Sequence, residues 1–226
     1  MDELKRPPLR ERNRQAARGL ILDAAERLLR EDASADFSMR ALAAEADVGF
    51  ATPFNHFGNK NAIMQALSAR LIDSMAERFR QRPPAAGPKA ETAIGRVLVM
   101  GGIATGLLLE QPEVSKAVVG SLGVANQAPG AIRPHSGALW SLALGDHAGL
   151  AAAVRPAAER VLAGLLAFQF RGCVSFWIAG ELQDAELGPA FATGASVLLL
   201  GFADRPQRTR LLEQIARAPG ASRPAT

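Results

Sequence analysis

Apolar residues recur three or four positions apart along most of this 226-residue chain. Between Leu20 and Leu29 they are separated by charged residues, as expected for a helix with one apolar face. The same spacing returns between Ile63 and Phe79. Alternating β-branched runs, the usual pattern of strands, are absent from the sequence. The pattern therefore predicts an all-α fold.

Residues 37–60 predict two short helices joined by a tight turn. Ser38 is a good N-cap for a helix over residues 39–46, because its hydroxyl can accept from a backbone amide of the first turn. A second short helix is expected over about residues 50–56. Asn59 is in position to cap the longer helix that follows.

Proline and glycine set the later boundaries. The run 82–88 contains three prolines and a glycine and cannot stay helical. Beyond it, helices are expected over about residues 91–111, 112–124, 136–144, 156–181, 185–203 and 207–218.

Composition permits a large core and a nucleic-acid partner. Hydrophobic residues make up 48% of the chain, the formal charge is +4 and the pI is about 10.0. The first residues form a basic arm ahead of the first apolar repeat, and its cations are Lys5, Arg6, Arg10, Arg12, Arg14 and Arg18. Such an arm either lies along phosphates or in a minor groove, or stays a solvated tail.

Cysteine usage and hydropathy bear on the compartment. Cys173 is the single cysteine, so no disulfide can form within the chain, which fits a reducing cytoplasm. The first residues lack the apolar core of a secretory signal. The apolar run 97–109 is too short to span a membrane, and 187–203 is only a minimal span interrupted by Pro189. We expect a cytoplasmic protein with buried apolar helices and no membrane partner.

The two short helices have the pattern of a helix-turn-helix. In this motif one helix lies over the DNA backbone while the second enters the major groove. Leu42 and Val48 can brace the pair, while Asn55 and Lys60 supply donors for base edges and phosphates.

At these residues the chain resembles the TetR family of bacterial regulators. The first helix contains Ile21-Leu22-Asp23-Ala24-Ala25, similar to the family's Ile-Leu-x-Ala-Ala motif. The family's recognition-helix pattern is matched without a gap by Val48, His56, Phe57 and Lys60, with Asn59 in place of Ser. A weaker resemblance in the C-terminal half rests on the run 176–182.

Three residues depart from the family pattern. Gly49 stands where a Ser cap is usual, Pro53 lies inside the recognition helix, and Phe54 replaces a Tyr. Because proline is tolerated only in the first turn, we expect the regular helix to start late, with Thr52 as its cap and Pro53 as its first residue.

The resemblance implies roles for individual side chains. Phosphate-positioning roles fall on Ser38, His56 and Lys60, and base-reading roles on Arg40, Phe50, Thr52 and Asn55. Each has an alternative: Ser38 as a cap alone, Lys60 as a solvated cation, His56 as a packing or capping residue, and Phe50 as a partly buried one.

The resemblance also implies two domains, a DNA-binding head of residues 1–60 and a helical effector-binding and dimerisation domain of residues 61–226. The helices over 156–181 and 185–203 are apolar around most of their circumference, so they form either a four-helix dimer interface or the core of one subunit. A two-fold homodimer would require a near-palindromic double-stranded operator.

The apolar helices between residues 91 and 150 are either plain core or the lining of a pocket for a small apolar effector. The residues proposed to test this are Met100, Trp140, Phe168 and Trp177. The expected function is a repressor released by that effector.

Other functions remain open. One alternative is a regulator or adaptor without an effector. Another is an enzyme using Cys173 or His147, which is disfavoured because Cys173 lies alone in an apolar helix and Asp146, next to His147, would point in another direction. We expect no catalytic site, metal site or cofactor.

Overall fold

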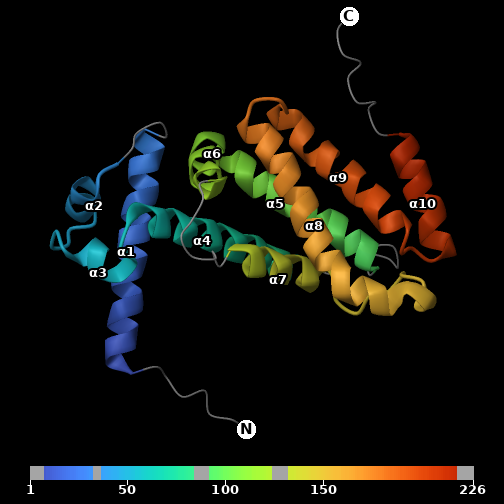
Figure 1. Cartoon of the computed structure of the whole chain (residues 1–226), viewed down its shortest axis with the longest axis horizontal. Coiled ribbons are helices and arrows are strands. Elements are labelled where there is room, and N and C mark those ends of the chain that lie inside the picture. Colours follow the sequence, from blue (N-terminus) through green and yellow to red (C-terminus); the bar gives the residue numbers. More distant parts are fainter. Residues whose placement is uncertain (1–7, 33–36, 84–91, 124–131, 218–226) are drawn as a thin grey trace, which may run out of the picture. The chain divides into compact units, whose positions relative to one another are not determined.

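The computed structural model describes residues 8–32, 37–83, 92–123 and 132–217. In these ranges the chain is built from helices, and the only extended pairing is a single antiparallel bridge between Leu150 and Ala203 (Figure 1). The expectation of an all-α fold is confirmed.

The helix boundaries follow the apolar spacing closely. The α-helices are α1 (Leu9–Glu31), α2 (Met39–Glu45), α3 (Thr52–Phe57), α4 (Lys60–Gln81), α5 (Ala93–Glu110), α6 (Pro112–Gly120), α7 (Ile132–Leu144), α8 (Arg155–Ile178), α9 (Asp184–Leu200) and α10 (Arg205–Ala216). Single 3₁₀ turns cover Ser121–Gly123 and Ala152–Val154.

Local side chains account for several helix starts. The Ser38 hydroxyl accepts from the Ala41 amide at 3.0 Å, and the Asn59 carbonyl oxygen accepts from the Ala62 amide at 2.9 Å. Both caps confirm the sequence prediction. Between α3 and α4, Gly58 has a φ of +79°, a conformation that favours glycine.

The described helices pack as two compact units. The first comprises residues 1–70 with 111–130, and the second comprises 71–110 with 131–226. α4 contributes to both, and α6 belongs to the first, where Val118 joins a core that includes Ile21, Leu42 and Ile63. This packing division differs from the expected head of residues 1–60, whose functional assignment stays a prediction.

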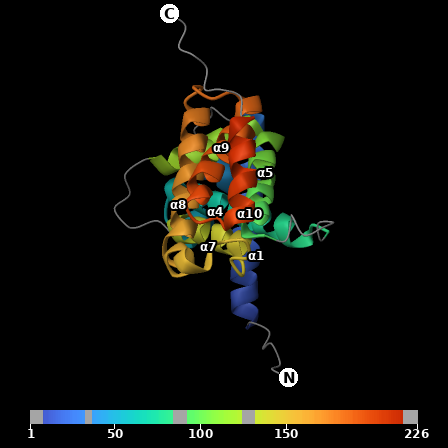
Figure 2. The same ribbon diagram turned by 90° about the vertical axis from the view of Figure 1, so that its right-hand side faces the viewer.

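The second unit is a helical bundle in which α9 packs against α5, α8 and α10 (Figure 2). At its centre the Trp140 ring stacks on Phe191, with ring centroids 5.0 Å apart, and Phe170 meets both rings edge-on. Gly101 of α5 allows this packing, because a Cβ there would lie 2.1 Å from the Phe191 ring.

Two segments are long and apolar enough to cross a membrane by length and composition, namely Ala93–Glu110 and Ala152–Ile178. In α5 the apolar side chains include Val97, Met100 and Leu108, all buried in the bundle. α8 differs, because part of its apolar surface is exposed.

Candidate nucleic-acid interface

In the first unit, α2 packs on α1 and on α3. The turn between α2 and α3 is tight: Asp47 has a φ of +51°, and the Val48 amide donates to the Ala43 carbonyl at 3.0 Å. Val48 then packs against the head core. Two short helices joined by a braced turn are the arrangement that the sequence predicted.

The start of α3 corrects one expectation. Thr52 was expected to be the cap, but the flanking residue is Ala51, whose side chain makes no capping bond, and Thr52 is the first helical residue. The Thr52 amide donates to the Gly49 carbonyl at 2.8 Å, so its backbone already belongs to the helical turn. Pro53 lies in that first turn, where its missing amide is tolerated, and it is buried.

The outer surface of α3 and of the turn before it carries aromatic and amide groups together. Phe50 and Phe54 are 60% and 42% exposed, and their rings meet edge-on with centroids 5.6 Å apart. Asn55 beside them is exposed, and Thr52 is partly exposed. Arg40 is exposed on α2. These four predicted base-reading residues, Arg40, Phe50, Thr52 and Asn55, are all accessible to a partner.

The expected phosphate-positioning residues are partly engaged within the head. Lys60 is half-buried, with its Nζ 4.2 Å from the centroid of the Phe37 ring. His56 is half-buried too, and its Nδ1 is buried without a hydrogen-bond partner among the described residues. Ser38 is exposed while it caps α2. The phosphate roles of all three stay predictions.

Arginines hold the motif together through contacts that the sequence did not predict. Arg18 of α1 donates to the His56 carbonyl at 2.6 Å, and its guanidinium lies 4.1 Å from the centroid of the Phe57 ring. Arg70 of α4 reaches Asp23 of α1 at 2.5 Å. α1 is thereby tied both to the end of α3 and to α4. Only the helical spacing of Arg18 from Ile21 could have indicated its contact.

The four residues proposed for an effector site have different surroundings. Met100, Trp140 and Trp177 are buried, whereas Phe168 is 58% exposed. The Trp177 indole N–H donates to Asp184 at 2.7 Å. The Trp140 indole N–H is buried and has no acceptor among the described residues. Whether these residues bind an effector stays a prediction.

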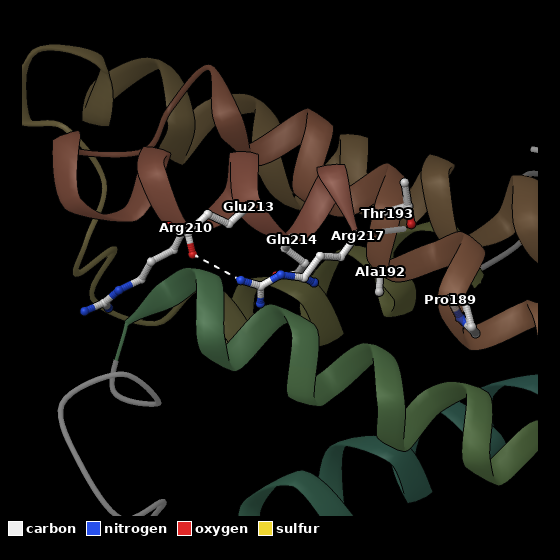
Figure 3. A pocket seen from close by; sticks show the side chains of 7 residues that line it. All are labelled: Pro189, Ala192, Thr193, Arg210, Glu213, Gln214 and Arg217. Carbon is white, nitrogen blue, oxygen red and sulfur yellow. Dashed lines mark ion pairs between the residues drawn. The ribbon is translucent and has the colours of Figure 1, made fainter. Parts of the chain in front are cut away.

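An open groove of about 480 Å³ lies between α9 and α10 (Figure 3). Its lining residues are Pro189, Ala192, Thr193, Arg210, Glu213, Gln214 and Arg217. Arg217 and Glu213 form an ion pair across one turn of α10. None of the four proposed effector residues lines it.

The residues weighed for an enzyme do not form a reactive arrangement. Burial raises the pKa of the Cys173 thiol, which disfavours the nucleophilic thiolate. A hydrogen bond from Arg96 lowers the pKa of the Asp146 carboxyl, and the same oxygen accepts from the Ala148 amide. Asp146 is therefore engaged with groups other than the His147 ring. Among the described residues, no three His, Cys, Asp or Glu side chains are placed to share a metal ion.

Comparisons with known proteins match this head. Residues 21–67, from the first buried position of α1 into α4, match the family model of bacterial regulatory proteins of the tetR family. The head of the chain therefore has the sequence of a TetR-family DNA-binding domain. The family's regulators bind DNA, typically act as dimers and are generally not enzymes. No curated protein matched the chain in sequence.

Solved structures share the fold of this chain. A TetR transcriptional regulator from Rhodococcus sp. RHA1 superposes with a TM-score of 0.65 at 23% identity, over 82% of this chain and 96% of that one. A putative transcriptional regulator from Streptomyces coelicolor A3(2) gives 0.47 at 22% identity, over 89% and 98% of the two chains. A gamma-butyrolactone receptor described as ArpA-like gives 0.46 at 13% identity, over 91% and 98%.

Proposed function

We propose that this TetR-family transcriptional regulator is a cytoplasmic repressor that binds a near-palindromic double-stranded operator as a homodimer. The observation that carries the proposal is the exposed surface of α3 and of the turn before it. Phe50 of the turn meets Phe54 of α3 edge-on, Asn55 is exposed next along the helix, and Arg18 binds the end of the helix. A short helix held at one end and presenting an amide and apolar ring edges fits a major groove.

The base-reading roles follow from the exposed groups. Asn55 can pair with adenine in a bidentate manner, and the Phe50 ring and the Thr52 methyl can contact a thymine methyl. Arg40 at the start of α2 can reach a guanine edge or a phosphate. Lys60, held over the Phe37 ring, is pre-oriented rather than flexible, which suits a phosphate contact at the entry to α4.

The homodimer is supported by one face of α8. Val161, Leu165 and Phe168 follow one another at spacings of four and three, and Phe176 continues the same side. All four are large apolar residues between 39% and 58% exposed, which we call the α8 face. A helix stripe this apolar is usually covered by a partner, and a second copy in a two-fold arrangement would cover it.

The release of DNA is proposed to follow binding of a small apolar effector by the helices within residues 61–226, while residues 1–60 serve the operator. Trp140 supports this part of the proposal, because a buried N–H without an acceptor costs free energy that a ligand oxygen would recover. Phe168, exposed on the α8 face, fits subunit contact better than an internal pocket.

The DNA-binding role can be tested with duplexes selected by the protein from a random pool. Asn55→Ala should reduce the preference for the selected duplex over random DNA by about tenfold, since one bidentate base contact contributes about 1–3 kcal/mol of discrimination. Lys60→Ala should weaken binding to both duplexes alike. It should also reduce the slope of log affinity against log salt concentration by about one, because one phosphate contact is lost. Dissociation constants at two salt concentrations measure both effects.

Arg208→Ala, which removes an exposed cation of α10, is the control for the change in net charge. Equal losses on selected and random DNA in Asn55→Ala would contradict the base-reading role. A wild-type protein that enriches no sequence at low salt would favour an adaptor function instead.

A further inference from the structure

The N-terminal part of α1 is a helical extension of the head rather than an extended arm. Residues 9–20 are helical, and the first buried residue of α1 is Ile21. Leu9 and Leu20 are more than half exposed, and Arg10, Arg12 and Arg14 are exposed. Of the cations expected in a basic arm, Lys5 and Arg6 lie outside the described residues, and the others, from Arg10 onward, are carried on a helix.

Three of these cations lie on the same side of α1 as the residues that face the head core further along the helix. Arg10, Arg14 and Arg18 are four residues apart, so each is rotated by only about 40° from the last. The same side continues three and seven residues later with Ile21 and Ala25, which are fully buried in the head. We call Arg10, Arg14 and Arg18 the arginine stripe.

Arg18 shows which neighbour this side of the helix faces. Its guanidinium donates to the His56 carbonyl at the end of α3 and lies over the Phe57 ring. α1 then runs on beyond α3 toward the N-terminus (Figure 1). Arg14 and Arg10 therefore extend from the side of α1 that carries the recognition helix.

These two arginines are available to a partner. Neither makes a hydrogen bond or an ion pair among the described residues, and Glu11, the one acidic residue within 8–20, accepts from Gln15. From Arg10 to Arg18 the helix rises by about 12 Å, which is the length of three to four base pairs of duplex DNA. Guanidinium groups bind phosphate oxygens through paired hydrogen bonds.

We propose that the arginine stripe contacts the phosphate backbone of the operator outside the base pairs read by α3. Each subunit would then cover a flank of about one-third of a helical turn in addition to its major-groove half-site. The flank contributes affinity without sequence preference, because phosphates are the same at every base pair. This inference rests on the proposed DNA-binding function.

Arg14→Ala and Arg12→Ala form a matched pair for the test. Both remove one exposed cation from the same segment of α1, and alanine preserves the helix, but their side chains are about 160° apart around it. On a selected operator with natural flanks, Arg14→Ala should weaken binding about fivefold and reduce the salt slope by about one, whereas Arg12→Ala should change affinity less than twofold. Hydroxyl-radical footprints should lose protection of the flanking backbone in Arg14→Ala alone.

Trimming the duplex to the base pairs contacted by α3 supplies the second arm. The wild-type protein should lose affinity on the trimmed duplex, and Arg14→Ala should bind it as well as the wild type does. Equal losses of affinity in Arg14→Ala and Arg12→Ala would contradict the contact between the arginine stripe and the flanking phosphates. So would a wild-type protein that binds the trimmed duplex as tightly as the full one. Either result would leave the proposed DNA-binding function intact. A wild-type protein without any operator preference would overturn the proposed function itself.

Discussion

Trp140 is fully buried, and its indole N–H has no acceptor in the part of the chain that the structure describes. Its ring is held by Phe191 and Phe170, and its residue exposure is 0%. A buried donor without an acceptor costs about 1–3 kcal/mol of folding free energy. A ligand whose oxygen accepts from this N–H should therefore bind more tightly than a hydrocarbon of the same size. Trp177 offers a contrast within the same bundle, because Asp184 already accepts from its N–H.

The effector role of Trp140 can be tested with pairs of ligands of equal chain length, such as 2-decanone and decane. The ketone should raise the melting temperature of the wild-type protein more than the alkane does and should lower operator affinity in parallel, as linked sites require. Trp140→Phe should reduce the preference for the ketone by about three- to tenfold, the equivalent of one hydrogen bond. An unchanged preference would contradict the role of the indole N–H, and Trp177→Phe is the matched control.

Contacts between residues close in the sequence could be predicted, whereas contacts between distant residues could not. The caps at Ser38 and Asn59 were foreseeable because donor and acceptor lie three residues apart. The contact of Arg18 with His56 joins residues 38 positions apart, and no local pattern encodes it. The predicted start of α3 was wrong by one residue. Thr52 was expected as the cap, but its amide already donates to the Gly49 carbonyl, so Thr52 is the first helical residue.

At the scale of elements, α5 and α9 meet through a glycine. Gly101 faces the Phe191 ring, whereas a Cβ on the neighbouring Gly102 would meet nothing within 4 Å. Apolar spacing predicted a helix over 91–111 but could not distinguish these two glycines, because the partner ring comes from a helix ninety positions later. The helical state of residues 9–20 was likewise missed, since their charged residues give no apolar face.

Gly101→Ala and Gly102→Ala should therefore change the free energy of unfolding in opposite directions. The new Cβ at position 101 would lie 2.1 Å from Phe191 and force a shift of the ring or the helix, costing about 1–3 kcal/mol of unfolding free energy. At position 102 alanine should stabilise the helix by up to about 1 kcal/mol. Urea denaturation of both variants measures the difference, and equal changes in stability would contradict the close approach of the two helices.

At the scale of the whole molecule, we expect the α8 face to form the interface of the proposed homodimer. Substituting Phe168 by Glu should convert that dimer to monomer, because a carboxylate would be buried without a partner in the interface. Leu212→Glu is the control, since Leu212 is 50% exposed on α10 and lies off the α8 face. Sedimentation equilibrium gives the mass of each variant, and a Phe168→Glu protein that remains dimeric would place the interface elsewhere.

The all-α class and the helix-turn-helix followed from the sequence because helical periodicity and turn residues are local signals. The membership of α6 in the first unit did not, since Val118 looks like any apolar residue of an amphipathic helix. Only the folded chain shows that a segment beyond residue 110 completes the core of the head.

That membership has a consequence for how the protein is made. The head core is built from α1 to the first part of α4 and then from α6, with the whole of 71–110 intervening. During synthesis, the first seventy residues leave the ribosome without the segment that carries Val118 and without Gln111, which accepts from Arg30 at 2.8 Å. The DNA-binding head therefore reaches its final packing only after α5 has been synthesised, so a truncated N-terminal product would have an incomplete core and would be a poor competitor for the operator.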